Sequence, residues 1–485
     1  MAINLKNKTL LKTGALINGE WVDGNNHYNV FNPSTGDMIA QVSCCGRQET
    51  VIAVSAASKA LKLWKRKTAK ERAQLLRNWF NLIVENQRDL AVILTEEQGK
   101  PLSEAMDEIT YGASYVEWFA EEAKRIYGDI IPGPSNDKKV VVIKDPIGVV
   151  ACITPWNFPN AMLTRKIAPA LAAGCTVICK PANNTPLSAN ALGELAIQAG
   201  IPVGVINIVS GYTREIGAEL TRNPIIKKLT FTGSTPVGKK LMRECAQTVK
   251  RTSMELGGNA PFIVFDDADL DAAVQGAMIS KFKNAGQTCV CSNRILVHNT
   301  VHDRFVKKLI QATQQLKIGD GMAAGTQIGP VIDEGAAQNI LALIEDAVAK
   351  GGVVMTGGKN AVNGPCFIQP TVLTQVDKTM RIFNEEIFGP VAPVFIFHTE
   401  EEAIDIANST EFGLASYFYT RDIGRVWRVS EALDCGVVGV NVGAISNEMA
   451  PFGGVKESGN GREGSKYGLD DYLEIKYLCM GGLDK

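Results

Sequence analysis

Residues 149–180 read VVACITPWNFPNAMLTRKIAPALAAGCTVICK, and this stretch decides the fold. Two apolar, β-rich runs, Val149–Ile153 and Thr176–Cys179, enclose a segment of helical character. Similar runs follow at Val205–Val209 and Lys228–Phe231, and each is followed by a helical stretch. Runs buried on both faces and separated by helices are typical of parallel strands in βαβ units. The sequence therefore predicts an α/β sheet of the Rossmann, dinucleotide-binding type.

A second alternating region lies further along the chain. It begins near Pro261 with PFIVF, continues through an expected helix at Ala268–Lys281, and extends to about residue 445. Because 485 residues exceed what one core usually organises, a second α/β domain is expected, with a cleft between the two. Before the first sheet we expect a hairpin at Ala15–Val22 and a helix opened by a capping box of Thr68 and Glu71.

Two further strand-like runs are peripheral to both domains. They are Lys138–Lys144 and Asp471–Met480. Together they predict a small oligomerisation β-flap that pairs with a partner subunit, although an ordinary edge hairpin fits the pattern equally well. The expected division is a dinucleotide-binding domain (1–127 and 147–254), a catalytic domain (255–445), the flap (128–146 and 470–485) and a connecting, substrate-site segment (446–469).

Composition narrows the classes of partner. The formal net charge is −1, from 50 basic and 51 acidic residues, so no basic excess is available for nucleic acid or an anionic membrane. The first 14 residues lack an apolar core of signal-peptide length, and no run reaches the length of a membrane span. Eleven scattered cysteines fit reduced thiols. We expect a cytoplasmic protein.

Two glycine-rich stretches imitate nucleotide motifs. Gly459–Gly464 matches G-x-G-x-x-G, but the chain ends too soon afterwards for a Rossmann unit. Gly233–Lys239 resembles a Walker A loop, yet Lys240 stands where a magnesium-binding hydroxyl is required. The second stretch follows an expected strand and leads into a helix, so it is either a phosphate site or a plain turn.

A cysteine and a glutamate are the candidate reactive groups. Cys289 follows the small and polar residues Asn284–Thr288, and Glu255 precedes a double glycine. A single free cysteine is usually just buried, and a single glutamate is usually a solvated charge. The chain has four histidines, of which only His298 is near Cys289 in sequence, so a cysteine–histidine hydrolase is a poor fit.

Six motifs together resemble the aldehyde dehydrogenase superfamily, in order and in spacing. The resemblance covers essentially the whole chain and is closest to the succinate-semialdehyde dehydrogenases, through NFPNAMLTRK (157–166), CVC (289–291) and the ending GREGSKYGLDDYLEIKY (461–477). The six motifs are Pro155–Pro159 (PWNFP), Lys180–Ala182 (KPA), Phe231–Ser234 (FTGS), Glu255–Gly258 (ELGG), Gly286–Cys289 (GQTC) and Glu386–Pro390 (EIFGP).

The resemblance implies a mechanism. Cys289 attacks an aldehyde, and the resulting alkoxide is stabilised by the Asn157 amide and the Cys289 backbone N–H. Hydride leaves for a nicotinamide, and Glu255 activates the water that hydrolyses the thioester. No metal is required.

The resemblance also implies the cofactor contacts. Where NAD-selective relatives often carry a glutamate, this chain has Asn183, so a 2′-phosphate is not repelled and NADP is favoured, with NAD as the alternative. Lys180 is expected near the adenine-side ribose, and Phe388 against the nicotinamide side. The full set of expected contacts is Trp156, Asn157, Lys180, Pro181, Ala182, Asn183, Gly233, Ser234, Leu256, Glu386 and Phe388.

For the substrate, the resemblance implies an aldehyde with a distal carboxylate. Arg165 matches a carboxylate-binding arginine, Lys283 stands where close relatives often have arginine, and Ser446 is a third candidate. Because a point charge replaces a bidentate fork at Lys283, succinate semialdehyde and glutarate semialdehyde both stay open. An uncharged aldehyde as substrate, a non-catalytic binding protein and a cofactor-independent esterase are the rival interpretations.

Regulation and assembly complete the expectations. Cys291 lies two residues from Cys289, and we advance the hypothesis that the pair is a redox switch. A disulfide between them would be strained and therefore easily reduced. The alternative is that Cys291 merely packs. The flap and the resemblance imply a homodimer or homotetramer. The resemblance further implies a role in 4-aminobutyrate degradation.

Overall fold

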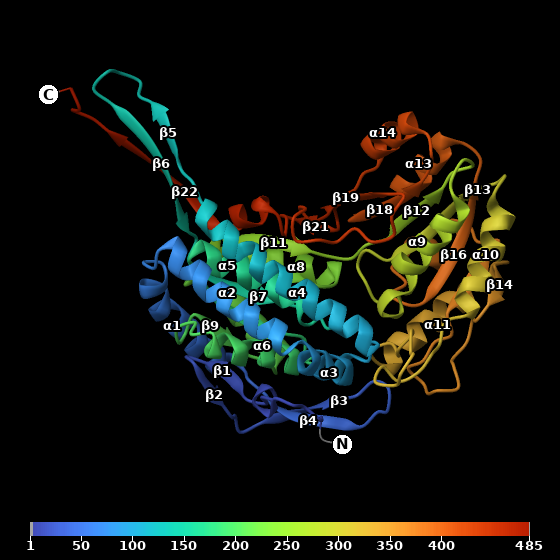
Figure 1. Cartoon of the computed structure of the whole chain (residues 1–485), viewed down its shortest axis with the longest axis horizontal. Helices are drawn as coiled ribbons and strands as arrows, with labels where there is room; N and C mark the ends of the chain where they lie inside the picture. Colours follow the sequence, from blue (N-terminus) through green and yellow to red (C-terminus); the bar gives the residue numbers. More distant parts are fainter. Residues whose placement is uncertain (1–2, 485) are drawn as a thin grey trace.

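The computed structural model describes residues 3–484. Figure 1 shows two α/β layers side by side, with a narrow sheet projecting from the first. The carboxyl-terminal end lies at the tip of that projection. The α/β class and the small flap predicted from the sequence are therefore present.

The first layer is an eight-stranded sheet. Its five central strands run parallel, and in spatial order they are β9, β8, β7, β10 and β11. In spatial order the strands are β2 (Glu20–Val22), β1 (Ala15–Ile17), β9 (Ile206–Ile208), β8 (Thr176–Lys180), β7 (Val149–Ile153), β10 (Ile226–Thr232), β11 (Arg251–Glu255) and β21 (Gly459–Asn460). Its helices are α1 (Arg47–Trp64), α2 (Ala69–Glu85), α3 (Gln87–Gln98), α4 (Leu102–Glu122), α5 (Ala161–Ala173), α6 (Pro186–Gln198), α7 (Thr213–Arg222) and α8 (Thr235–Cys245).

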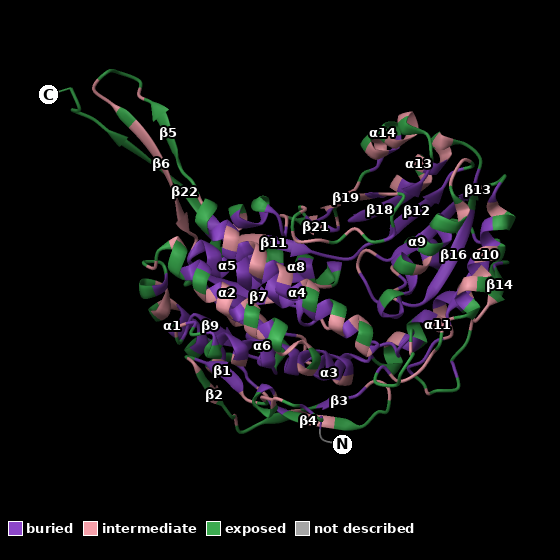
Figure 2. Ribbon diagram, viewed as in Figure 1, coloured by how far each residue is buried: buried purple, intermediate pink, exposed green. Residues whose placement is uncertain are grey.

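Alternating side chains of the central strands explain why both faces are covered. On β7, Val150 and Cys152 pack into a core shared with α2, α4, α5 and α6. Val149 and Ala151 point the other way, into a core shared with α1, α7 and α8. Figure 2 shows that the helices covering this sheet combine buried residues with intermediate and exposed ones. The expected capping box is confirmed, because Thr68 and Glu71 bond reciprocally at the start of α2.

The second layer is a seven-stranded sheet, parallel except where β14 meets β15. Its spatial order is β14 (Val353–Thr356), β15 (Thr371–Thr374), β16 (Val391–Phe397), β13 (Ser292–His298), β12 (Ala260–Val264), β18 (Ala415–Tyr419) and β19 (Val437–Val440). The helices are α9 (Leu270–Phe282), α10 (His302–Gln314), α11 (Glu334–Ala349), α12 (Arg381–Asn384), α13 (Glu400–Asn408) and α14 (Ile423–Ala432).

The projecting sheet has the order β22 (Leu473–Met480), β6 (Lys139–Pro146), β5 (Asp129–Pro132), and it is largely exposed in Figure 2. Its last strand starts later than the sequence pattern predicts. Asp471 and Tyr472 belong instead to the 3-10 helix η5 (Lys466–Tyr472), because Tyr472 is buried in the first core and the Asp471 carboxylate accepts a hydrogen bond from Ser253 Oγ at 2.7 Å.

Two two-stranded sheets lie outside the three larger ones. A hairpin of β3 (His27–Phe31) and β4 (Met38–Ser43) lies beside the first layer, and β17 (Phe412–Gly413) pairs with β20 (Val455–Lys456). The glycine-rich stretch that imitates a Rossmann motif forms the edge strand β21 against β11. A Cβ at Gly459 would lie 1.8 Å from the Met254 carbonyl oxygen, so this close pairing requires glycine.

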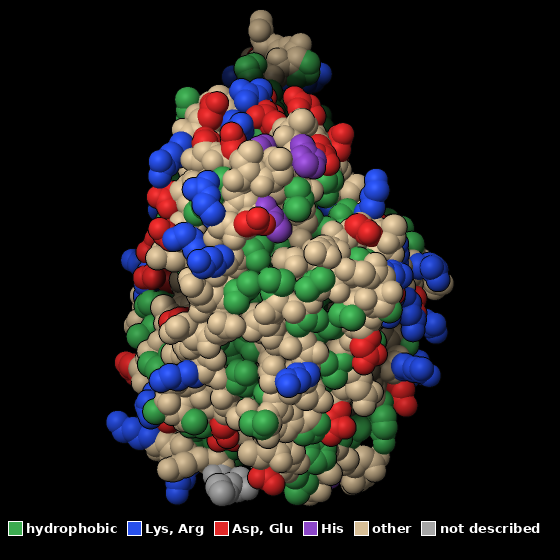
Figure 3. All heavy atoms as spheres, turned by 90° about the vertical axis from the view of Figure 1, so that its right-hand side faces the viewer, with side chains coloured by type: hydrophobic (Ala, Val, Ile, Leu, Met, Phe, Trp, Pro, Cys, Tyr) green, Lys and Arg blue, Asp and Glu red, His purple; other side chains and the backbone are tan. Residues whose placement is uncertain are grey.

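The surface carries charges of both signs. On the face that Figure 3 presents, acidic and basic side chains are interspersed. Among the described residues, no helix is long and apolar enough to cross a membrane.

Candidate active site

A cavity of about 460 Å³ lies where the carboxyl ends of β7, β10 and β11 face the amino ends of β13 and β18. Its lining combines segments more than 300 residues apart in sequence. It is lined by Asp107, Glu108, Tyr111, Pro155, Trp156, Asn157, Phe158, Met162, Arg165, Thr232, Gly233, Ser234, Leu256, Gly257, Ile279, Ser280, Lys283, Thr288, Cys289, Val290, Glu386, Phe388, Tyr417, Gly443, Ala444, Ile445, Ser446 and Phe452.

The turn before Cys289 is left-handed for three successive residues. Asn284, Ala285 and Gly286 have φ values of 52°, 54° and 77°. A Cβ on Gly286 would lie 2.1 Å from the Gly389 carbonyl oxygen, so the third position admits only glycine. This turn brings the half-buried Cys289 to the cavity. Burial, followed by the charge of Glu255, raises the pKa of the Cys289 thiol to about 12.

Asn157 follows β7 and lines the same cavity. Its Nδ2 donates to the Gln287 carbonyl oxygen at 2.9 Å, two residues before Cys289. Its own carbonyl oxygen accepts hydrogen bonds from Lys100 Nζ at 2.8 Å and from Asn284 Nδ2 at 2.9 Å. The amide is therefore tied directly to the loop that carries the cysteine.

Glu255 ends β11 just outside the set of lining residues. It is buried, and neither carboxylate oxygen has a hydrogen-bond partner within residues 3–484. Burial and the neighbouring Glu463 carboxylate raise its pKa well above the usual range, although Arg165 and Lys166 oppose that shift. A carboxyl with a raised pKa and no partner is typical of a functional acid or base.

Arg165, on α5, also lines the cavity, and only 2% of it is exposed. Its Nε lies 2.9 Å from Glu463 Oε2, and its Nη1 donates to the Tyr111 hydroxyl at 3.3 Å. The guanidinium lies 4.3 Å from the centre of the Phe452 ring. Neither Nε nor Nη2 has a hydrogen-bond partner in the described chain, although Nε is in the ion pair with Glu463. The hydrogen-bonding capacity of this buried cation is therefore not fully used.

Lys283 and Ser446 lie on the exposed rim of the same cavity. The three residues expected to bind the substrate therefore line one cavity with Cys289, although they come from three distant segments.

Most of the expected cofactor contacts also line the cavity. Trp156 and Phe388 meet edge to face, with ring centroids 5.5 Å apart. Gly233 and Ser234 directly precede α8, where Ser234 is the N-cap residue and no side chain caps the first N–H groups. Glu386 accepts a hydrogen bond from the Gly258 N–H at 3.1 Å, and burial raises its pKa to about 7. A helix start with free N–H groups is suited to a phosphate.

Residues 180–183 lie outside the cavity, at the end of β8. Lys180 Nζ donates to the Pro181 carbonyl oxygen at 3.2 Å and to Asn183 Oδ1 at 3.4 Å. Asn183 Nδ2 donates to the Gly211 carbonyl oxygen at 2.8 Å. Burial lowers the pKa of Lys180 to about 8. These residues form a separate polar corner at the carboxyl edge of the first sheet, and Ala182 belongs to it.

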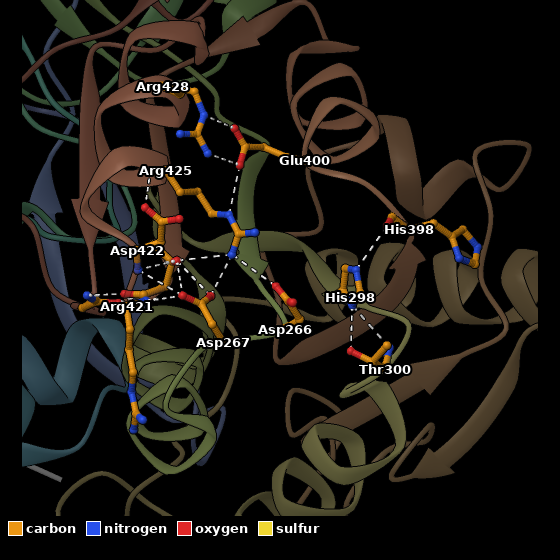
Figure 4. A network of polar contacts seen from close by, with 12 residues as sticks. Asp266, Asp267, His298, Thr300, His398, Glu400, Arg421, Asp422, Arg425 and Arg428 are labelled. Atoms are coloured by element: carbon orange, nitrogen blue, oxygen red, sulfur yellow. Dashed lines mark hydrogen bonds and ion pairs between the residues drawn. The ribbon is translucent and has the colours of Figure 1, made fainter.

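His298 does not pair with Cys289. It lies at the opposite end of β13, where its ring bonds Thr300 Oγ1 at 2.8 Å and the His398 carbonyl oxygen at 3.1 Å (Figure 4). In the described part of the chain, no group of three acidic, histidine or cysteine side chains could hold a metal ion.

Sequence reasoning missed several residues around the site. Glu463 contacts both Arg165 and Lys166, with a 2.5 Å ion pair to Lys166 Nζ. Lys100 and Glu108 lie behind Asn157. Glu463 lies within the GREGSKYGLDDYLEIKY ending, but that motif assigns it no role, whereas Lys100 and Glu108 carry no local signal at all.

A family model described as the aldehyde dehydrogenase family matches residues 21–478. The chain belongs to the aldehyde dehydrogenase family. Its fold is accordingly the aldehyde dehydrogenase fold, as the six motifs predict.

Three curated relatives, each 59% identical, carry different substrate names. One is 3-sulfolactaldehyde dehydrogenase of Pseudomonas putida, covering all of both chains. Another is the NADP⁺ succinate-semialdehyde dehydrogenase of Escherichia coli K12, covering 99% of this chain and 100% of the relative. The third is glutarate-semialdehyde dehydrogenase of Pseudomonas aeruginosa, with the same coverage. Aldehyde oxidation is common to these names, and the aldehyde differs.

Solved structures of aldehyde dehydrogenases have the same fold. An NADP-dependent enzyme from Escherichia coli matches with a TM-score of 0.98 at 58% identity, covering 99% of this chain and 100% of that one. Betaine aldehyde dehydrogenase from Staphylococcus aureus, solved with NAD⁺, matches with a TM-score of 0.95 at 36% identity, covering 98% and 95%. Both dinucleotides thus occur among similar enzymes.

Proposed function

We propose that this aldehyde dehydrogenase oxidises a short aldehyde with a distal carboxylate, succinate semialdehyde first among them, to the dicarboxylic acid. The observation that carries the proposal is Arg165, which lines the same cavity as Cys289 and whose buried guanidinium has an unpartnered Nη2 in the described chain. An unpaired buried donor costs free energy, which a substrate carboxylate would recover.

In the acylation step, the Cys289 thiolate attacks the aldehyde carbon. Asn157 Nδ2 would leave its bond to the Gln287 carbonyl, and with the Cys289 N–H it would bind the developing alkoxide. When bound, the nicotinamide dinucleotide accepts the hydride that this adduct releases. The acyl group of the substrate is left bound to Cys289 as a thioester.

Glu255 then removes a proton from the water that hydrolyses the thioester. Burial keeps its carboxyl protonated at a higher pH than an exposed glutamate, so the basic form gains as pH rises. The same residue is the proposed acceptor of the Cys289 thiol proton, because it lies close enough for its charge to raise the Cys289 pKa.

The residues present fit a dinucleotide, and we favour NADP over NAD. The uncapped start of α8 at Ser234 suits a phosphate, and the Trp156–Phe388 pair suits a flat ring beside the cysteine. In the polar corner, Lys180 supplies a cation, whereas Asn183 is neutral and would not repel a 2′-phosphate. No metal has a role in this scheme.

The length of the acid depends on Lys283. Its exposed ammonium at the rim could bind a second carboxylate oxygen less specifically than a guanidinium would. Glutarate semialdehyde is therefore the second candidate. An uncharged aldehyde is disfavoured by the free donor of Arg165, and a non-catalytic binding protein or an esterase would need neither the cysteine–glutamate pair nor the cofactor residues together.

Cys291 is proposed as the second half of a redox switch. Its side chain is 2% exposed, with Sγ 3.5 Å from the Lys281 carbonyl oxygen. Oxidation by hydrogen peroxide would join Cys289 and Cys291 in a disulfide, releasing two protons and two electrons that reduce the peroxide to water. Thiol-reversible inactivation that disappears in Cys291→Ala would support the switch; its persistence there would refute it.

Assembly and location are proposed from the flap and the family. Ile130, Ile475 and Tyr477 expose 82%, 71% and 64% of their surface on the projecting sheet, as a surface covered by a second copy would. We propose a cytoplasmic homodimer or homotetramer that acts in 4-aminobutyrate degradation.

The substrate proposal is tested by kcat/KM across aldehydes. Succinate semialdehyde, glutarate semialdehyde and butyraldehyde would each be followed at 340 nm with NADP and with NAD. A higher kcat/KM for the two carboxylated aldehydes supports the proposal. Butyraldehyde turned over as well as either of them would contradict it.

A further inference from the structure

Lys100 and Glu108 form an ion pair that is wholly closed to solvent. Lys100 lies between α3 and α4, and its Nζ is 2.6 Å from Glu108 Oε2, with both side chains 0% exposed. The same ammonium donates to the Asn157 carbonyl oxygen at 2.8 Å and lies 3.8 Å from the centre of the Phe158 ring. The ion pair thus contacts the backbone of the proposed oxyanion residue directly.

Stability does not account for this pair. Removing two charges from water costs about as much as their attraction returns, and apolar replacements of buried pairs are often neutral or stabilising. A positional role is the better explanation, because an ion pair fixes distances more strictly than an apolar contact.

The pair holds two parts of the site at once. Glu108 Oε1 accepts hydrogen bonds from the N–H groups of Asn160 at 2.9 Å and Ala161 at 3.2 Å, where α5 begins. Lys100 Nζ holds the Asn157 carbonyl just before that helix. The backbone from Asn157 to the start of α5 is therefore fixed on one side by two charged groups.

Asn284 holds Asn157 from the other side. Its Nδ2 donates to the Asn157 carbonyl oxygen at 2.9 Å, and its N–H donates to Glu104 Oε2 at 2.7 Å. Gln98 Nε2 donates to Asn284 Oδ1 at 3.0 Å. The carbonyl of Asn157 is thus clamped between Lys100 and the left-handed turn that leads to Cys289.

We propose that Lys100 and Glu108 are positioning residues that fix the Asn157 amide relative to Cys289, and so set how well the tetrahedral alkoxide is bound. This inference rests on the proposed function of Asn157 and Cys289. Catalytic donors must be held within about 0.5 Å of their productive geometry. Losing the clamp would leave the nucleophile in place and misplace the donor.

The test is Lys100→Met, which keeps most of the unbranched side chain and removes its charged end. We expect kcat to fall about 10- to 100-fold, up to the loss seen when an oxyanion donor is removed outright. Alkylation of Cys289 by iodoacetamide forms no oxyanion, so its rate should stay within about twofold of wild type, as should the Kd for NADP.

Arg72→Met is the matched control. Arg72 is also buried and donates its Nε to a carbonyl at the opposite end of α5, that of Ala172, at 3.0 Å. It should lower the melting temperature without changing kcat. If Lys100→Met does not fold, the variant Lys100→Met/Glu108→Gln keeps an acceptor for Asn160 and Ala161 and carries the same expectation.

A double-mutant cycle separates this inference from the proposed function. In an Asn157→Ala background, Lys100→Met should change kcat by less than about twofold, because the donor it positions is gone. Three results would each overturn the inference. They are effects of the two substitutions on kcat that multiply in the double variant, an unchanged kcat in Lys100→Met, and an alkylation rate that falls as far as kcat. Absence of dehydrogenase activity in wild type would instead overturn the proposed function.

Discussion

In both large sheets, polar side chains lie at the edge formed by the carboxyl ends of parallel strands, but the two edges differ in whether those side chains have hydrogen-bond partners. At the edge of the first sheet, Thr154, Thr232 and Glu255 follow or end strands, and their side-chain oxygens lack hydrogen-bond partners within residues 3–484. At the edge of the second sheet, Arg425 is bonded to Asp267 at 2.8 Å and to Glu400 at 3.0 Å (Figure 4). The polar side chains named at the first edge are unpartnered within the described chain, and those at the second edge bond to one another.

The difference also appears in the pKa values at each edge. Burial raises the pKa of Glu255, which has no partner in the described chain. Burial acts in the same direction on Asp267, but hydrogen bonds from the Arg421 N–H and Thr420, with the charge of Arg425, lower its pKa overall. Unsatisfied groups cost stability and are expected at sites of function, whereas satisfied groups stabilise the fold.

Glu255→Gln should show the largest effect at the first edge. We expect kcat to fall by about 10²- to 10⁴-fold, because the base that activates water is lost. The folded-state pKa of Glu255 is raised, so its contribution to stability is present at low pH and is lost as pH rises through that value. The glutamine variant should therefore gain stability over wild type at pH 9 and not at pH 4. Thermal unfolding at both pH values checks this, and a gain confined to pH 4 would contradict it.

Arg165→Met should lower kcat/KM for succinate semialdehyde by about 10- to 100-fold, the contribution of a hydrogen bond between charged groups. Butyraldehyde, which has no carboxylate, should lose much less. The ratio of the two kcat/KM values is the measurement. An equal loss for both aldehydes would mean that Arg165 supports the fold rather than the carboxylate.

Arg425→Met tests the second edge. Since its side chain is 19% exposed, we expect the free energy of unfolding to fall by about 1–3 kcal/mol, with kcat unchanged. The pKa of Asp267 is lowered in the fold, so the stability it contributes is present above its unfolded pKa and lost as pH falls. The difference from wild type in urea unfolding should therefore shrink below pH 4. A loss of kcat without a loss of stability would contradict the difference that we infer between the two edges.

Lys283→Arg should have the smallest effect. The planar, bidentate guanidinium of arginine at the exposed rim should lower KM for succinate semialdehyde by no more than about fivefold, because exposed ion pairs contribute at most about 1 kcal/mol. Steady-state KM for succinate and glutarate semialdehyde would be compared. A larger change for glutarate semialdehyde would favour the longer acid as the substrate.

Much of the fold could be predicted because its signals are local. The β7 segment VVACI is apolar throughout, and the β8 segment TVICK is apolar at its centre. Thr68 and Glu71 predict the start of α2 within four positions. The sequence pattern starts β22 two residues too early, since the burial of Tyr472 in a distant core has no local signature. Tertiary packing overrides the strand pattern there.

The candidate site divides in the same way. Cys289, Glu255 and Asn157 lie in motifs that resemble a known family, so each can be named from the sequence. The clamp cannot, because Lys100 meets Asn157 across 57 positions of sequence, and Arg165 meets Glu463 across almost 300. A lysine in a loop and a glutamate on a helix are ordinary surface residues until folding buries them together.

The most direct test of the account follows absorbance at 340 nm with purified wild type and Cys289→Ala, each supplied with succinate semialdehyde and NADP. The central claim is that the chemistry occurs at Cys289, where the carboxyl edge of the first sheet meets the second. It predicts a steady rise for wild type and no rise above background for the variant, with both proteins equally folded. Retained activity in Cys289→Ala, or none in wild type with any aldehyde and either dinucleotide, would contradict the claim.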